Sequence, residues 1–476
     1  MSEPGPVDCT TYLSRFPPVW PEDSLRRQIA RQLRENRHCI VALDDDPTGT
    51  QTVHDIWVVT DWEVDTIQAA LVDGEPALYI LTNSRSLPLP EAQSINKEVA
   101  TNLIDAARRA RRPISVVSRS DSTLRGHYPG EVIALGQALI EEALYPVAGV
   151  CIIPFFPEGG RFTAEDVHWV REDDQLIPAA QTPYARDSVF GYVHSHLPSW
   201  VEEKTVGRVP VSNVTSVTLG HLRRGGPDQV CEILMGVKEG GVVIVNALDY
   251  RDLEVFVVGS MQAEREGKKF LFRTAASFVK VAAGIEDKAL LLREELVEDE
   301  KGAGGLIVFG SHVPKSNAQL EALRSVEGVE TIELPVRDVL LEEERQNVIE
   351  RACSFINGML AKSMDSVIYT SREVVLGLDS DATLDVGKQV SSALVEVIQR
   401  VEVKPKYVIA KGGITSSDVA TKALGIRAAR VLGQVYPGVP AWKMGEESRW
   451  PGLAYVVFPG NVGEAETVAE IVKMLR

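Results

Sequence analysis

Short apolar runs rich in β-branched residues alternate with helical segments along most of this chain, and this alternation limits the fold more than any other feature. The runs HCIVAL, DIWVVT, ALYILT, ISVVS and VAGVCIIP read as short buried strands, with helices expected near 62–72, 90–110 and 129–143. Strands that are apolar throughout and separated by helices are typical of parallel sheets covered on both faces. The sequence therefore predicts an α/β protein.

The length and one break in this pattern predict two domains. A chain of 476 residues exceeds what a single hydrophobic core usually serves. The alternation stops at the charge-dense, glycine-rich segment LREELVEDEKGAGG and then resumes with GLIVFGS. We expect an N-terminal arm, a first domain, a linker and a second domain, each domain a mostly parallel sheet with helices on both faces. These parts cover 1–24, 25–291, 292–305 and 306–476.

The composition narrows the class of protein. The chain carries 50 Lys and Arg against 67 Asp and Glu, a formal net charge of −17, which disfavours nucleic acid and anionic membranes as partners. The five cysteines are scattered without a CxxC pair, which indicates reduced thiols in a cytoplasmic protein. The histidines are not spaced as a metal-binding cluster, so no metal site is predicted. Neither a signal peptide nor a membrane helix is expected.

Three consecutive carboxylates close the first strand, in the sequence VALDDDPTGT. Asp44, Asp45 and Asp46 place like charges side by side at a loop, and folding alone gains nothing from their repulsion. A hydroxyl that must lose its proton, a divalent cation, or both would use such a group. The alternative is an Asp-Pro turn in which Asp44 or Asp46 caps the next element.

Other polar loops of the first half follow predicted strands, at the edge where open α/β sheets bind ligands. They cover 82–86, 118–127 and 156–163. The second of these, SRSDSTLRGH, is the densest, because three hydroxyls and an aspartate lie between Arg119 and Arg125. Arginine forks bind carboxylates and hydroxyls bind sugar hydroxyls. The alternative is that Asp121 or Ser122 caps the helix that starts near Pro129.

The second half carries glycine-rich turns that could approach a phosphate. The turn KGGITSSD follows one strand and precedes a helix, FGSH follows a second strand and PGNVG a third. The first of these also reads as an ordinary strand–turn–helix cap. The sequence contains neither a Walker A motif nor GxGxxG, HExxH or GxSxG. Any nucleotide must therefore occupy a site of another type.

Taken in order, DDDPTGT, NSRS, SRSDSTLRGH, FPEGGRFT, GSHVPKSNAQ, KGGITSSD and PGNVGE resemble the four-carbon acid sugar kinases. The resemblance runs from about residue 38 to the end of the chain, and SDSTLRG is its most specific part. It implies an N-terminal domain that binds a sugar acid such as threonate, erythronate or a 3-oxo-tetronate. It also implies a C-terminal domain that binds ATP, with Mg²⁺ bridging the phosphates and the γ-phosphoryl group passing to the C4 hydroxyl.

Carried onto this chain, the resemblance assigns roles to particular residues. The catalytic residues would be Asp45 and Asp46, one of which orients the hydroxyl and accepts its proton. The substrate-binding residues would be Arg85, Ser120, Asp121, Ser122, Thr123, Arg125 and Arg161. The nucleotide-binding residues would be Ser311, Gly412, Gly413, Ile414, Thr415 and Gly460. Phe458 stands where many relatives have a lysine, and Arg119-Ser120 precede Asp121 where many have a lysine alone, so the chain belongs to a divergent branch.

Two other interpretations are compatible with the sequence. One is a dehydrogenase or aldolase that acts on the same sugar acids, although the dinucleotide fingerprint is missing. The other is a sensor that binds a sugar acid or a nucleotide without turnover, against which the carboxylate triplet argues. The expected partners are a small sugar acid and ATP, and a homodimer is expected only because twofold oligomers are common.

Overall fold

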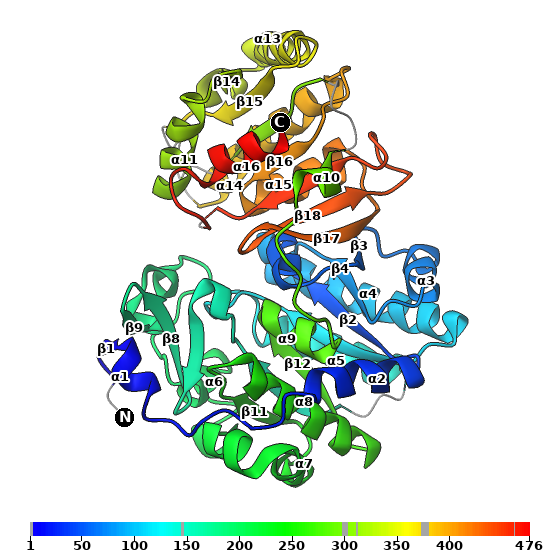
Figure 1. The fold of residues 1–476 in the computed structure, drawn as a ribbon, viewed down its shortest axis with the longest axis vertical. Coiled ribbons are helices and arrows are strands. Elements are labelled where there is room, and N and C mark those ends of the chain that lie inside the picture. Colours follow the sequence, from blue (N-terminus) through cyan, green and yellow to red (C-terminus); the bar gives the residue numbers. More distant parts are fainter. Residues whose placement is uncertain (1–2, 144–146, 298–302, 311–312, 373–379, 461) are drawn as a thin grey trace. The chain divides into compact units, whose positions relative to one another are not determined.

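The computed structural model describes residues 3–143, 147–297, 303–310, 313–372, 380–460 and 462–476. The chain forms two compact units, Met1–Asp287 and Lys288–Arg476, each with its own sheet and helices (Figure 1). The predicted α/β class, with a mostly parallel sheet in each of two domains, is confirmed.

The first unit is built on an eight-stranded sheet in the order β10-β11-β6-β12-β5-β2-β4-β3, with every neighbouring pair parallel. The central strands are buried at nearly every position, as the apolar runs predicted. Because the strands are parallel, the loops that follow them leave from one edge of the sheet. The bounds are β2 Cys39–Asp44, β3 Ile56–Val59, β4 Ala77–Leu81, β5 Ile114–Arg119, β6 Val147–Ile153, β10 Val214–Val217, β11 Gly241–Val245 and β12 Lys269–Thr274.

Helices connect these strands and cover the sheet (Figure 1). Their starts follow local chemistry: the Asp249 side chain caps α8 and Asp252 completes its capping box. Helix α2 buries Leu25, Ile29 and Leu33, a single stripe at every fourth position. The helices are α2 Leu25–Glu35, α3 Val64–Val72, α4 Leu89–Ala110, α5 Gly130–Ala143, α6 Leu197–Lys204, α7 Gly226–Gly236, α8 Tyr250–Arg265 and α9 Ala276–Ala282.

Residues 155–205, which are rich in aromatic side chains, contribute three strands to a second, antiparallel sheet. Its order is β1-β9-β8-β7, with β7 Arg161–Ala164, β8 Val167–Glu172 and β9 Gln175–Pro178. Strand β1, Val7–Asp8, comes from the N-terminal segment and is followed by helix α1, Cys9–Leu13. The segment expected to be an N-terminal arm, 1–24, thus contains a strand and a helix, and main-chain pairing with β9 holds it in the second sheet.

The second unit has the sheet order β17-β18-β19-β16-β13-β15-β14. Strands β14 Val329–Leu334, β15 Asp365–Thr370, β13 Leu306–Phe309, β16 Val408–Lys411 and β19 Ala454–Phe458 are parallel, whereas β17 Ala428–Tyr436 and β18 Val439–Met444 pair antiparallel. Helices α10 Arg293–Leu296, α11 Pro314–Arg324, α12 Val336–Val339, α13 Glu342–Leu360, α14 Ser380–Arg400, α15 Gly413–Asp418 and α16 Thr467–Leu475 complete the unit.

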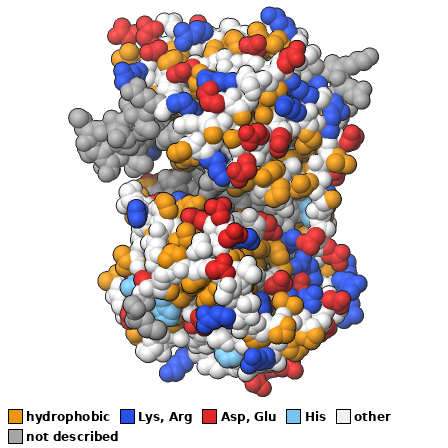
Figure 2. All heavy atoms as spheres, turned by 60° about the vertical axis from the view of Figure 1, so that its left-hand side comes forward, with side chains coloured by type: hydrophobic (Ala, Val, Ile, Leu, Met, Phe, Trp, Pro, Cys, Tyr) orange, Lys and Arg blue, Asp and Glu red, His pale blue; other side chains and the backbone are white. Residues whose placement is uncertain are grey.

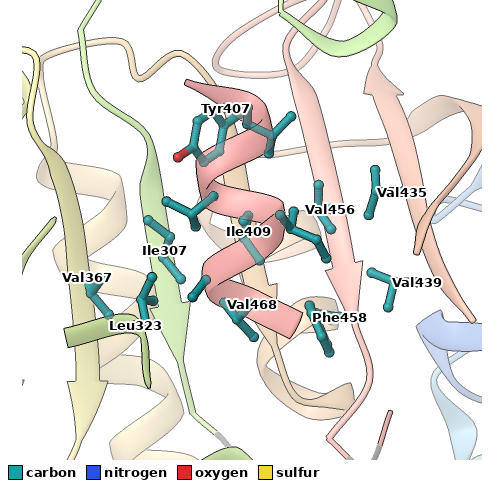
Figure 3. Packing of buried hydrophobic residues seen from close by; sticks show 14 of the residues in the cluster. Ile307, Leu323, Val367, Tyr407, Ile409, Val435, Val439, Val456, Phe458 and Val468 are labelled. Carbon is teal, nitrogen blue, oxygen red and sulfur yellow. The ribbon is translucent and has the colours of Figure 1, made fainter. Parts of the chain in front are cut away.

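One hydrophobic core of the second unit lies between this sheet and helices α11 and α16. Figure 3 shows Ile307 of β13, Ile409 of β16 and Val456 of β19 gathered around Val468 of the helix. Burying one such side chain contributes about 1.5–3 kcal/mol. Leu296, within the expected linker, also belongs to this core. On the face shown in Figure 2, acidic and basic side chains are interspersed. In the described parts of the chain, no helix combines the length and apolarity that crossing a membrane requires.

Candidate active site

The polar loops of the first unit meet at the carboxyl edge of its sheet. Asp44 ends β2 and lies opposite Arg119, which ends β5, while Thr274 ends β12 on the other side of β5. Main-chain bonds extend this pairing into the loops, since Asp45 N donates to Arg119 O and Ser120 N to Thr274 O. Parallel pairing thus brings together loops that are far apart in the sequence.

Asp44 forms the buried base of this site. It is 1% exposed, and Nη1 of Arg119 lies 3.0 Å from its Oδ1. Burial raises the pKa of Asp44 to about 7; the charge of Arg119 opposes this rise, while Asp45 and Asp46 add to it. A Cβ atom at Gly49 would lie 1.8 Å from Oδ2, so only glycine allows the loop to close over this carboxyl group.

Asp45 is held from two sides. Nε of Arg85 lies 3.1 Å from its Oδ2, Nη2 of Arg85 binds Oδ1, and the Ser120 hydroxyl donates to Oδ2 at 2.6 Å. A Cβ at Gly126, where φ is +110°, would lie 2.7 Å from Ser120 Oγ, 3.1 Å from Asp45 Oδ2 and 3.4 Å from Nη2 of Arg273. Three polar groups therefore converge on the bare backbone at Gly126.

Asp46 combines a capping role with a place at the site. Its Oδ1 accepts hydrogen bonds from the backbone N (2.9 Å) and the hydroxyl of Thr48, so it caps the 3₁₀ turn Pro47–Thr52. The capping alternative is thus real for this residue. Its Oδ2 lies 3.5 Å from Nη1 of Arg85. Burial favours a higher pKa, but Arg85 and Arg119, with the Thr48 bonds, hold the pKa of Asp46 below its ordinary value.

The loop after β5 adds a third carboxylate around Arg85. Nε of Arg125 lies 2.8 Å from Asp121 Oδ2, the Thr123 hydroxyl donates to the same oxygen, and Oδ1 lies 3.9 Å from Arg85. Burial opposes ionisation, yet both arginines and the Thr123 bond hold the pKa of Asp121 well below its usual range. The backbone carbonyl of Ser122 accepts a hydrogen bond from His168 Nε2 at 2.7 Å, which fixes this loop to β8.

Arg125 and Arg161 share one aromatic platform. The guanidinium carbon of each lies 5.3 Å from the ring centre of Tyr184. Nε of Arg161 has no hydrogen-bond partner among the described residues, whereas Nε of Arg125 is committed to Asp121. Of the predicted anion-binding arginines, Arg161 therefore retains unused donor capacity, and Arg85 is occupied by protein carboxylates.

Three site residues escaped the sequence reasoning. Arg273, the penultimate residue of β12, donates to the Arg125 carbonyl at 3.2 Å and has a buried Nη1 without a described partner. Glu131 accepts hydrogen bonds from the Ser84 hydroxyl and from an asparagine of α4, and burial raises its pKa, with nearby Asp45 adding to the rise. Tyr184 belongs to the aromatic segment. Of these, Arg273 could have been found from the sequence, because it lies at the end of the apolar run KFLFRT, where strands of open α/β sheets carry site residues.

The second unit carries its own cluster of glycine turns. Strands β13, β16 and β19 are neighbours, and the predicted residues Gly412, Gly413, Ile414 and Thr415 follow β16. Gly412 has φ of +112°, and a Cβ at Gly310 would lie 1.8 Å from Thr415 Oγ1, so the turns after β13 and β16 touch. Ile414 is exposed. Ser311 lies outside the described residues.

Lys411 links the turn after β16 to the turn after β19. Its side chain is fully buried, and its ammonium donates to the carbonyls of Pro459 and, at 3.3 Å, Gly460. The same nitrogen lies 4.1 Å from the ring centre of Phe458. Burial, with the charge of Lys315, lowers the pKa of Lys411 to about 7. The predicted nucleotide-binding residues follow two different strands, and Lys411, next to Gly412 in the chain, connects them by its hydrogen bond to Gly460.

The structure brings most of the sequence-predicted residues together within each unit. Asp45, Asp46, Arg85 and Asp121 are linked through direct contacts, and Ser120 joins them through Asp45. Thr123, Arg125 and Arg161 extend the same edge, while Ser122 contributes a backbone carbonyl. In the second unit, Lys411 and Ser316 donate to the Gly460 carbonyl, and Gly412 N donates to Phe458 O at 2.8 Å. These contacts describe positions; the roles assigned to the residues remain predictions.

Comparisons with known proteins match each half of the chain to a domain family. A sugar-binding N-terminal domain family matches residues 40–282, and a nucleotide-binding C-terminal domain family matches residues 306–468. A comparison with curated proteins finds no match.

Solved structures share the fold. A Salmonella typhimurium LT2 protein, provisionally named a tRNA synthase, is 15% identical with a TM-score of 0.66, covering 92% of this chain and 99% of its own. A Haemophilus influenzae protein of the DUF1537 family is 18% identical with a TM-score of 0.61, covering 92% and 100%. At these identities the likeness concerns the fold. The first domain family alone spans more than half of the sequence, so the chain belongs to the family that joins a sugar-binding N-terminal domain to a nucleotide-binding C-terminal domain.

Proposed function

We propose that this protein is an ATP-dependent kinase that phosphorylates the C4 hydroxyl of a four-carbon sugar acid such as threonate, erythronate or a 3-oxo-tetronate. The observation that carries the proposal is the gathering of Asp45, Asp46 and Asp121 around Arg85 at the carboxyl edge of a sugar-binding domain. A nucleotide-binding domain in the same chain supplies the second requirement of a kinase.

The carboxylates divide the work at the acceptor hydroxyl. Both oxygens of Asp45 are engaged by Arg85 and Ser120, which suits a residue that organises the site. Among the described residues, Oδ2 of Asp46 contacts only Arg85, at 3.5 Å, and the Asp46 side chain is 20% exposed. Asp46 is thus the better candidate to orient the hydroxyl and accept its proton. In phosphoryl transfer, accurate positioning of the hydroxyl matters more than removal of its proton.

The carboxylate of the substrate requires an arginine with free donors. Nε of Arg161 is buried without a hydrogen-bond partner among the described residues, and Arg125, stacked on the same tyrosine ring, adds a second positive charge. Bidentate Arg–carboxylate pairing gives both energy and orientation. Because the chain is acidic overall, this local positive charge is what would draw an anionic substrate to the site.

ATP would bind the second unit through the turns at 412–415 and 460, whose bare backbone allows a phosphate to approach. Mg²⁺ needs only one or two protein carboxylates when it also binds nucleotide phosphates. Asp46 Oδ2 and Asp121 Oδ1, which lie 3.5 and 3.9 Å from Nη1 of Arg85, are carboxylate oxygens that could bind it. When bound, the ion would neutralise charge that develops on the transferred phosphoryl group.

The test is ADP release. The purified protein, ATP and Mg²⁺ are incubated with D- and L-threonate, D- and L-erythronate and 3-oxo-tetronates, with ATP alone as the control. Acid-dependent ADP release by one of these compounds supports the kinase and names its substrate. If an acid and ATP each raise the melting temperature but no ADP forms, the protein is a sensor, and the kinase proposal fails.

A further inference from the structure

A cavity of the first unit lies away from the candidate active site. It has a volume of about 420 Å³ and lies toward the amino ends of β2, β5 and β12, beneath α2 and α8. The carboxylates and arginines of the candidate site lie at the opposite, carboxyl ends of the same strands. A volume of this size falls in the range of small-molecule sites and greatly exceeds the voids that ordinary packing leaves.

The inner wall of this cavity is apolar and aromatic. Phe272 of β12 and Phe278 of α9 both line it, with ring centres 4.9 Å apart and ring planes inclined by 31°. Ile40, Val117 and Val257 complete the wall, and all of these side chains are buried in the fold. Such a surface suits a flat or compact apolar body.

The rim of the cavity is positively charged in an otherwise acidic protein. Lys269 and Glu264 balance each other, since their charged atoms lie 3.2 Å apart. Arg265 donates from Nη2 to Gln32 Oε1 at 2.8 Å and has no ion-pair partner in the described chain. Burial lowers the pKa of His38, whose Nε2 lies 2.8 Å from the Ser115 hydroxyl, so this ring adds little charge near neutral pH.

We propose that this cavity binds a small amphipathic monoanion, with its apolar body on Phe272 and Phe278 and its anionic group facing Arg265. The apolar wall selects the body, and the one uncompensated positive charge at the rim selects the head group. Ser115 and His38 offer hydrogen-bonding groups at the inner end of the rim. The site is separate from the proposed sugar-acid site and uses none of its residues.

The experiment is a calorimetric titration of the full chain with 2-naphthoate, naphthalene-2-carboxamide and acetate, without ATP or sugar acid. We expect 2-naphthoate to bind at one site per chain, the carboxamide to bind at least about tenfold more weakly, and acetate to give no detectable binding. Equal binding of the naphthoate and the carboxamide, or no naphthoate binding at millimolar concentration, would overturn the proposal. Because kinase substrates are absent, neither result decides the proposed function.

Two variants place the ligand in this cavity. Ser260→Phe fills it from a half-buried position of α8 and should abolish 2-naphthoate binding, with circular dichroism showing that the fold is kept. Arg265→Gln should weaken binding about tenfold, whereas Arg27→Gln, an exposed arginine of α2 outside the cavity, should leave it unchanged. Unaltered binding to folded Ser260→Phe, or to Arg265→Gln, would show that the ligand binds elsewhere.

Discussion

Oδ2 of Asp46 lies 3.5 Å from Nη1 of Arg85, while Oδ1 of the same carboxylate caps the turn that follows. One oxygen therefore serves the fold, and the other faces the site. This division of labour allows the two roles of Asp46 to be separated by a single isosteric substitution.

Asp46→Asn should abolish most activity without unfolding the protein. Asparagine caps as well as aspartate, so the melting temperature should change little, whereas loss of the charged oxygen should lower kcat by ~10²-fold or more. Asp249→Asn, at the cap of α8, is the matched control and should leave kcat unchanged. Steady-state kinetics of both variants make the comparison, and a kcat of Asp46→Asn within a fewfold of wild type would remove Asp46 from the mechanism.

Arg161→Gln should weaken binding of the sugar acid selectively. A charged hydrogen bond to the substrate carboxylate would be lost, which should raise KM for the acid about tenfold or more while KM for ATP stays constant. Arg171→Gln changes an exposed arginine of β8, whose Nε is 3.0 Å from the Asp173 carbonyl, and should alter neither constant. A KM for the acid that is the same in both variants would contradict the assignment.

Lys411→Met should act on the nucleotide instead. Methionine has a similar length but removes the ammonium that donates to the carbonyl of Pro459 and, together with the Ser316 hydroxyl, to that of Gly460. The turn after β19 should therefore lose its position. KM for ATP should rise about tenfold, with KM for the acid unchanged. Lys404→Met, at an exposed lysine, provides the control. A rise confined to KM for the acid would refute a nucleotide role for this turn.

The buried carboxyl of Asp44 predicts a pH dependence of stability. Its pKa is raised from 3.8 to about 7 in the folded protein, so the folded state holds the proton more tightly than the unfolded chain. Stability from this group is present at low pH and is lost as pH rises toward 7, by at most about 1.4 kcal/mol per pH unit. Asp44→Asn removes this titration.

Urea unfolding of the wild type and Asp44→Asn at pH 5, 6, 7 and 8 measures this effect. The apparent free energy of unfolding of the variant should gain on that of the wild type as pH rises from 5 to 7, and the difference should level off above pH 7. Two curves that stay parallel over the whole range would mean that Asp44 is ionised throughout.

Much of the first unit could be predicted because its strands are buried on both faces and therefore read as continuous apolar runs. Parallel pairing then brings the loops after Asp44, Leu81 and Arg119 to one edge without any further information. Strand β18 was not expected, because its sequence VPAWKM contains a proline and a lysine, which are uncommon in strands. In the structure this strand pairs antiparallel with β17.

Single residues outside motifs could not be found in this way. Tyr184 lies in a 3₁₀ turn, Pro183–Arg186, whose position depends on tertiary packing, and there its ring stacks with two arginines. The partners of Arg85 are equally tertiary: the sequence indicated a substrate-binding arginine, whereas the structure shows it occupied by three protein carboxylates. The expected homodimer stays a prediction.

The position of the transferred phosphate tests the central claim most directly. The acid that supports ADP release is incubated with ATP, Mg²⁺ and the protein, and the product is examined by ¹H–³¹P correlation spectroscopy. The account predicts one new phosphomonoester whose phosphorus couples to the protons on C4, in an amount equal to the ADP formed. A phosphate on another carbon, or ADP without any phosphorylated acid, would contradict it.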